Sequence, residues 1–158
     1  MAEKKRKLGK QIDTLEVGDY YTATRVIEDR DLLLYLGLTD DANPLYLQHD
    51  YASETPYQQP IVPVVMLFGM AASIVSMHLP GPGSHITRHE MSFPKPVYHY
   101  TEITFNLEII AVDRDAHQAT MSVIAYDNDG DEVVHGKLNV IPSYEPESIS
   151  GRSLKNFF

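Results

Sequence analysis

No cysteine occurs among the 158 residues of the sequence. A disulfide framework, a thiolate nucleophile and a cysteine-ligated zinc site are therefore excluded. The longest apolar run covers about 16 residues, at 64–79, and is shorter than the ~20 residues that a membrane-spanning helix needs. The basic start, MAEKKRKLGKQ, is not followed by the apolar region of a secretory signal. These absences predict a cytoplasmic protein with no membrane partner.

Positive charge is scarce outside the first ten residues. Those ten hold five Lys or Arg and one Glu, a net charge of +4, and the rest holds eight Lys or Arg against 21 Asp or Glu, a net charge of −13. Such an acidic body repels a phosphate backbone, so no nucleic-acid partner is predicted. The basic start is predicted to be a flexible, solvated tail over residues 1–12, with contact to an anionic partner as the alternative.

A metal site is not predicted either. Seven histidines are present, but none has the helical His-x-x-x-His spacing of zinc hydrolases, since His85 and His89 lie on a predicted strand. The chain length, with 43% hydrophobic and 22% charged residues, fits one soluble globular domain. We place this domain at residues 13–143, followed by a C-terminal extension at 144–158.

The first half of the sequence predicts one strand and several helices. Residues 20–28, YYTATRVIE, are β-branched and aromatic and favour a strand, and residues 29–38, DRDLLLYLGL, favour a short helix. A second short helix is predicted to begin at Pro44, with Asn43 as its N-cap. The apolar run at 64–79 ends at LPGPG, which predicts a helix that is buried on most of its faces.

The second half changes to a hydrophobic period of two, which is typical of strands. Four strands are predicted within residues 84–97, 101–112, 117–126 and 132–141, and DNDG at 127–130 is a hairpin signal. A helix that is apolar nearly all round needs a sheet curled about it. The predicted fold class is therefore α+β, an antiparallel sheet of about five strands wrapped around one long buried helix, as in a hotdog fold.

Five short motifs then carry a resemblance. They are DANPLY at 41–46, YA at 51–52, PIV at 60–62, LPGPG at 79–83 and FPKPV at 93–97. In this order they resemble the MaoC-like dehydratases and (R)-specific enoyl-CoA hydratases, a specific signal although each motif alone would be weak. The resemblance implies syn addition of water to an enoyl thioester of CoA or acyl carrier protein, or the reverse, without a cofactor. It also implies a homodimer or larger homo-oligomer.

The resemblance assigns roles to three positions. Asp41 matches the catalytic Asp and Asn43 the structural Asn. Val64 matches the residue at the helix start whose backbone N–H binds the thioester oxygen, where unpaired N–H groups and the positive end of the helix dipole stabilise an enolate. Read without the resemblance, Asp41 would be part of an acidic turn before a helix.

Three departures from the family pattern affect this assignment. Tyr46 stands where the family has its catalytic His, Pro63 and Val64 replace the usual His-Gly, and Asp40 replaces a Gly. A phenol with a pKa of about 10 cannot accept a proton at pH 7 as an imidazole does, although it can orient a water molecule. Tyr46 is either such a group or a core aromatic. The side chain of Val64 could crowd the thioester at the entrance formed with Pro63. Asp40 either acts on the charge of Asp41 or is simply solvated.

Two further residues are candidates for the site. Strand alternation places His85, Thr87, His89, Met91 and Phe93 on one face and Ile86, Arg88, Glu90 and Ser92 on the other. If Met91 and Phe93 face the helix, then His89 does too, and it becomes either a replacement base or a histidine with a structural hydrogen bond. Lys95 either binds a phosphate of CoA or the carrier or is a solvated lysine.

Three functions remain open at this point. The first is a hydro-lyase acting on an acyl thioester, with Asp41 as the main acid and base. The second is a non-catalytic acyl-thioester-binding protein or partner hotdog subunit. The third is a thioesterase that relies on a lone carboxylate near the helix.

Overall fold

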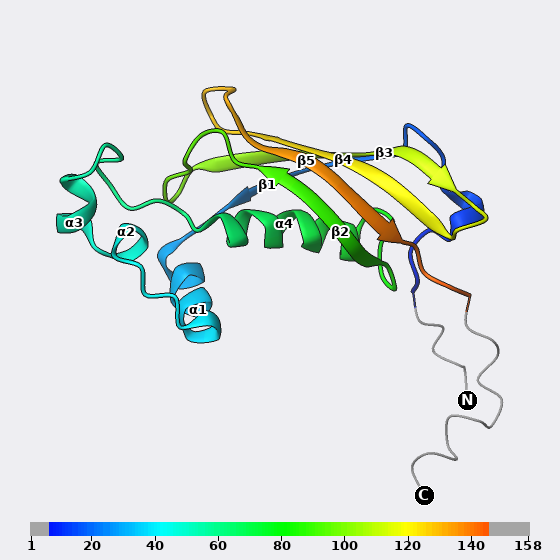
Figure 1. Cartoon of the computed structure of the whole chain (residues 1–158), viewed down its shortest axis with the longest axis horizontal. Coiled ribbons are helices and arrows are strands. Elements are labelled where there is room, and N and C mark those ends of the chain that lie inside the picture. Colours follow the sequence, from blue (N-terminus) through cyan, green and yellow to red (C-terminus); the bar gives the residue numbers. More distant parts are fainter. Residues whose placement is uncertain (1–6, 146–158) are drawn as a thin grey trace, which may run out of the picture.

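The computed structural model describes residues 7–145 and consists of one antiparallel sheet lying over one central helix (Figure 1). Three short helices extend from one end of this layered body. The elements are η1 (Ile12–Thr14), β1 (Tyr20–Val26), α1 (Asp29–Thr39), α2 (Pro44–Leu47), α3 (His49–Ser53), α4 (Val64–Met77), β2 (His85–Ser92), β3 (Glu102–Asp113), β4 (Gln118–Tyr126) and β5 (Glu132–Ile141).

The sheet has the strand order β1-β3-β4-β5-β2, and all neighbouring strands are antiparallel. The predicted hairpin at DNDG joins β4 to β5, and Gly130 has a φ of +79° there, a conformation open to glycine. The inner face of the sheet is built by alternate residues such as Ile103, Phe105 and Leu107, each with no exposed surface. The predicted α+β hotdog architecture is confirmed.

Helix α4 is less covered than its sequence predicted. Leu67, Ala71, Ile74 and Val75 are buried against the sheet, as expected for a helix that the sheet curls around. A single sheet covers only one side, however, and the side chains on the other side remain accessible: Val64 is 42% exposed, Val65 56% and Met77 59%. The apolar character all round therefore leaves an uncovered apolar surface in one copy of the chain.

Strand β2 corrects the predicted alternation of faces. Its pairing with β5 shifts between Ile86, opposite Val140, and Arg88, opposite Asn139, so Thr87 is an extra residue in the strand. The bulge reverses the faces of the residues before it. Ile86 therefore packs against the core on the same side as Met91 and Phe93, and the alternation from His89 does not extend back to His85. A one-residue bulge leaves no signal in hydrophobic alternation over so short a strand.

The described part of the predicted N-terminal tail is held against the body. The N–H groups of Gly9 and Lys10 donate to the carbonyl oxygens of Pro82 and Pro80 at 2.9 Å and 2.8 Å. A Cβ atom at Gly9 would collide with the Pro80 carbonyl oxygen, so the approach requires glycine. Residues 1–6 and, within the C-terminal extension, residues 146–158 lie outside the described residues. The domain bounds themselves stay a prediction.

One end of the sheet gathers the segments that matter for the site. The segment before α4 joins the connection between β2 and β3, because Val62 N–H donates to the Val97 carbonyl oxygen at 2.7 Å. Helices α1, α2 and α3 lie beyond this end in Figure 1. Among residues 7–145, none of the helices has the length and apolar character needed to cross a bilayer.

Candidate active site

The acidic loop at 40–43 leaves α1 by a sharp reversal. Asp40 is the C-cap of α1 with a φ of +56°, and its N–H donates to the Leu36 carbonyl oxygen at 2.8 Å. Glycine adopts this left-handed conformation most easily, and aspartate is among the few other residues that tolerate it. Asp40 thus does for the backbone what a glycine would do, and the reversal turns the following residue, Asp41, back toward α1.

The carboxylate of Asp41 meets a residue that sequence reasoning missed. The hydroxyl of Tyr35 donates a hydrogen bond to Asp41 Oδ2 at 2.8 Å, in a part-buried position. This bond, together with burial and the charge of Asp41, raises the pKa of Tyr35 above its ordinary value. The two residues are six apart, a spacing that brings side chains together only because of the reversal at Asp40. Helical periodicity alone gave no signal for the pair.

Asn43 and Pro44 begin α2 as predicted. Asn43 Oδ1 accepts a hydrogen bond from the N–H of Leu45 at 3.0 Å, which is N-cap geometry, and Pro44 occupies the first helical position. Tyr46 follows in the same helix and is half-buried. A phenolate at Tyr46 would raise the pKa of Tyr35 further, so the two phenols lie within electrostatic reach of each other.

The start of α4 carries a second group of candidate residues. Pro63 is buried and precedes the helix without a side-chain cap. Within residues 7–145, the N–H of Val64 has no hydrogen-bond partner, as expected at a first helical position. An open groove of about 510 Å³ begins at this point and is lined by Val64, Val65, Phe68, His89, Met91 and Phe93.

His89 is exposed on β2 and belongs to this groove. Its ring lies 4.5 Å from that of Phe68 of α4, measured between centroids, at an interplanar angle of 37°. His89 therefore faces the helix side of the sheet, as the sequence predicted for it together with Met91 and Phe93. Its role as a base stays a prediction.

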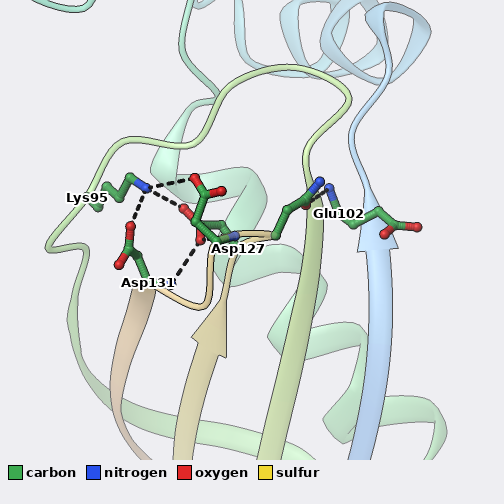
Figure 2. Close-up of polar contacts among 6 residues, drawn as sticks. Lys95, Glu102, Asp127 and Asp131 are labelled. Carbon is green, nitrogen blue, oxygen red and sulfur yellow. Dashed lines mark hydrogen bonds and ion pairs between the residues drawn. The ribbon is translucent and has the colours of Figure 1, made fainter.

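Lys95 lies apart from the groove, in an ionic cluster on the turn between β4 and β5. Figure 2 shows its ammonium group between Asp127, at 2.6 Å, and Asp131, at 2.7 Å. These carboxylates raise the pKa of Lys95. Because the lysine charge is already matched by two carboxylates, this environment is unfavourable for a phosphate. The phosphate role of Lys95 stays a prediction that the geometry does not favour.

The same turn is the one place among residues 7–145 where three carboxylates could hold a cation, namely Asp127, Asp129 and Asp131. The ammonium group of Lys95 already lies among them, 3.8 Å from Asp129. The N–H of Glu102 also donates to Asn128 Oδ1 at 3.0 Å, as drawn in Figure 2, which fastens the turn to β3. The cluster is therefore a structural link between the connection after β2 and the turn between β4 and β5.

The sheet, the central helix and the loop at the helix entrance define this chain as a hotdog domain. It belongs to the MaoC-like family, because the family model described as MaoC like domain matches residues 12–129. The (R)-specific enoyl-CoA hydratase of Aeromonas caviae is 28% identical over 124 residues, which are 78% of this chain and 92% of that protein. The mitochondrial 3-hydroxyacyl-[acyl-carrier-protein] dehydratase FERN of Solanum lycopersicum is 26% identical over 132 residues, 82% and 79% of the two chains.

Solved structures share the hotdog fold. The (R)-hydratase from A. caviae involved in PHA biosynthesis superposes with a TM-score of 0.77 at 28% identity, covering 80% of this chain and 96% of that one. R-hydratase PhaJ1 from Pseudomonas aeruginosa shares the fold, with a TM-score of 0.81 at 24% identity. The match covers 90% of this chain and 97% of that one. A chain of the ChsH1–ChsH2 complex from Mycobacterium tuberculosis has a TM-score of 0.72 at 19% identity. The match covers 80% of this chain and 98% of that one.

Proposed function

We propose that this chain is a hydro-lyase that hydrates an enoyl thioester, or dehydrates a 3-hydroxyacyl thioester, of CoA or acyl carrier protein. The observation that carries the proposal is the part-buried Asp41 carboxylate in a chain whose hydratase relative from A. caviae is 28% identical over most of both lengths. The N–H of Val64, which has no hydrogen-bond partner among residues 7–145, supports it, because an enolate oxygen needs such a donor.

The proposed hydration uses Asp41 twice. Asp41 takes one proton from water as the water oxygen bonds to the β-carbon, and the electron pair of the double bond moves to the thioester oxygen. The N–H of Val64 stabilises this enolate. The protonated Asp41 then returns its proton to the α-carbon, which restores the carboxylate and gives the 3-hydroxyacyl product. Because both additions occur on one face, a single carboxylate can perform both proton transfers.

The remaining site residues receive supporting roles. Tyr46 orients the water by donating a hydrogen bond, and Asn43 keeps the loop in place as the cap of α2. Pro63 fixes the chain at the entrance to α4. The apolar groove that starts at Val64 takes the acyl chain, whose apolar surface favours burial there. His89, on the wall of that groove, is the alternative second base.

A second candidate function follows from Tyr46. Without an imidazole at this position, the chain could bind an acyl thioester, or pair with a different hotdog chain, without performing the chemistry. A chain of the ChsH1–ChsH2 complex from Mycobacterium tuberculosis has this fold. We further propose that this chain itself forms homodimers, because one copy leaves apolar groups of α4 uncovered.

A panel of thioesters separates these functions. Incubation with crotonyl-CoA, longer enoyl-CoAs and saturated acyl-CoAs is followed by loss of the enoyl absorbance, by chromatography of the product and by release of free thiol. A hydro-lyase forms a 3-hydroxyacyl-CoA, whereas a thioesterase releases thiol from saturated substrates as well. Saturable binding with neither reaction contradicts the hydro-lyase and identifies the binding function.

A further inference from the structure

The two carboxylate oxygens of Asp41 have different partners. Oδ2 accepts the hydrogen bond from the Tyr35 hydroxyl at 2.8 Å, and Oδ1 receives only a long contact, 3.4 Å from the N–H of Asn43. Phenol donation to a carboxylate at 2.8 Å is a short, charge-assisted bond, whereas an N–H at 3.4 Å contributes little. Among the described residues, Oδ1 is therefore the oxygen that has more capacity left for another donor.

We propose that Tyr35 is a positioning residue for Asp41: its phenol holds Oδ2, so that Oδ1 is the oxygen that takes the proton from water and returns it to the α-carbon. The inference rests on the proposed hydro-lyase function. It adds a residue outside the DANPLY motif to the site and assigns different tasks to the two oxygens of one carboxylate.

The physical reason lies in the freedom of an aspartate side chain. Rotation about its last bond is broad, so a carboxylate without a strong partner samples many orientations. A phenol at position 46 does not replace the imidazole of the family as a neutral-pH base, so in the proposed hydration one carboxylate accepts the proton and delivers it on the same face. A fixed orientation raises the fraction of time in which Oδ1 is aligned for both transfers.

The rest of the loop suits this role of Tyr35. The left-handed conformation of Asp40 and the N-cap at Asn43 fix the backbone on both sides of Asp41. They do not fix the Asp41 side chain, so its orientation depends on the hydrogen bond from Tyr35. The pKa of Tyr35 is raised by its bond to Asp41, by burial and by the Asp41 charge, so its hydroxyl stays protonated and keeps donating throughout the neutral and mildly alkaline range.

The test is Tyr35→Phe, which removes the hydroxyl oxygen and keeps the aromatic ring. A hydrogen bond to a charged group contributes ~1.5–3 kcal/mol, and its loss is expected to lower kcat for crotonyl-CoA by about 10- to 100-fold. KM is expected to stay within about twofold, because the lost bond touches Asp41 rather than the substrate. Tyr20→Phe is the matched control, since Tyr20 is 75% exposed on β1, and it should keep full activity.

A second measurement tests the hydrogen bond without any catalysis. Tyrosine labelled with ¹³C at Cζ reports the ionisation of each phenol by NMR, and Tyr35→Phe assigns the signal of Tyr35. In Asp41→Asn, the Tyr35 phenol is expected to ionise at lower pH than in the parent, because its charged acceptor is gone. An unchanged Tyr35 titration contradicts the proposed contact.

The activity outcomes separate the two proposals. If the parent is active and its folded Tyr35→Phe variant keeps its full kcat, the positioning role of Tyr35 is contradicted, whereas the hydro-lyase proposal is not. A fall in kcat with KM unchanged, together with the NMR shift, supports it. A parent that transforms none of the thioesters contradicts the hydro-lyase proposal, and the role of Tyr35 fails with it.

Discussion

The backbone N–H of Ile61 donates a hydrogen bond to the carbonyl oxygen of Leu45 at 3.2 Å. Leu45 is the residue before Tyr46 in α2, and Ile61 lies three residues before Val64 at the start of α4. This bond joins the segment that carries Asp41 to the entrance of the central helix, and it uses no site side chain. Substitutions of the site side chains are therefore expected to keep this hydrogen bond, and thermal unfolding of each variant checks that the fold is retained.

Asp41→Asn is expected to abolish hydratase activity, with a loss of more than about 100-fold, because an amide cannot take the proton of water. Thermal unfolding should change little, since asparagine keeps an oxygen that can accept the bond from Tyr35. Kinetics with crotonyl-CoA and calorimetry measure the two effects. An Asp41→Asn variant that remains active would place the chemistry elsewhere.

Asp40→Asn is the control for that variant. Asparagine tolerates the left-handed conformation of residue 40 as well as aspartate does. If Asp40 acts through its backbone, Asp40→Asn keeps near-parental activity. A large loss of activity in this variant would instead show that the charge of residue 40 acts on Asp41.

The ionic cluster of Lys95 predicts a loss of stability in acid. Burial raises the pKa of Asp127, but the bond from Lys95 and those from the N–H groups of Asp131 and Asp129 outweigh it, and the net pKa lies below its ordinary value. A lowered folded pKa stabilises the fold above the unfolded value of ~3.9, and this contribution is lost as the pH falls through the folded pKa.

Asp127→Asn tests this contribution. The variant is expected to be less stable than the parent by about 1 kcal/mol at pH 7, and the difference should shrink as the pH falls below about 4. Urea unfolding at a series of pH values measures it. Asp115→Asn, on the exposed turn between β3 and β4, is the control without an ion pair within residues 7–145. A stability difference that does not vary with pH would contradict a role for the Asp127 charge.

The uncovered side of α4 predicts the mode of self-association. The edge strands of the sheet are β1 and β2, and β2 lies beside the groove with Val65 on its wall. We expect a homodimer formed across this region, in which a second copy covers the apolar surface. Light scattering should give a dimer or larger assembly at micromolar concentration. Val65→Asp should weaken it, whereas Tyr20→Asp at the other edge should not, and a monomeric parent would contradict the prediction.

The fold could be predicted from the sequence because its signals are local and mutually consistent. The long apolar segment marks α4, the period of two marks the strands, and Asn43 with Pro44 marks the start of α2. The side-chain contacts that could not be predicted depend on the backbone conformation of single residues. The reversal at Asp40 brings Tyr35 to Asp41, and the bulge at Thr87 moves Ile86 to the core side, and neither event changes the hydrophobic pattern.

The ion pairs of Lys95 could not be predicted from the sequence for a different reason. The motif FPKPV placed a cation near the site, and the sequence also displayed the acidic run DNDGDE. The two segments lie about 30 residues apart in the chain and come together only through the sheet, where β2 and β4 are both neighbours of β5. An ion pair of this sequence separation follows from topology, which strand patterns specify only in part.

Tyr46→His tests whether the missing imidazole limits the rate. A histidine in α2 would supply a base with a pKa near neutral beside Asp41, so the variant is expected to raise kcat, by up to ~100-fold or about 2.7 kcal/mol of barrier where the geometry allows. The parent should show a low but measurable rate of crotonyl-CoA hydration.

His89→Ala is the companion to this variant and identifies the alternative base. If His89 on the groove wall already acts as the second group, His89→Ala removes most of the activity and Tyr46→His adds little. If Asp41 works with Tyr46 alone, His89→Ala should change KM through its contact with Phe68 more than it changes kcat. A gain from Tyr46→His with kcat retained in His89→Ala supports Asp41 as the single acid and base. Absence of hydration in the parent and in Tyr46→His, even at high enzyme concentration, favours the binding function. In that case the side chains of Pro63 and Val64 would keep the thioester oxygen away from the backbone N–H at the start of α4.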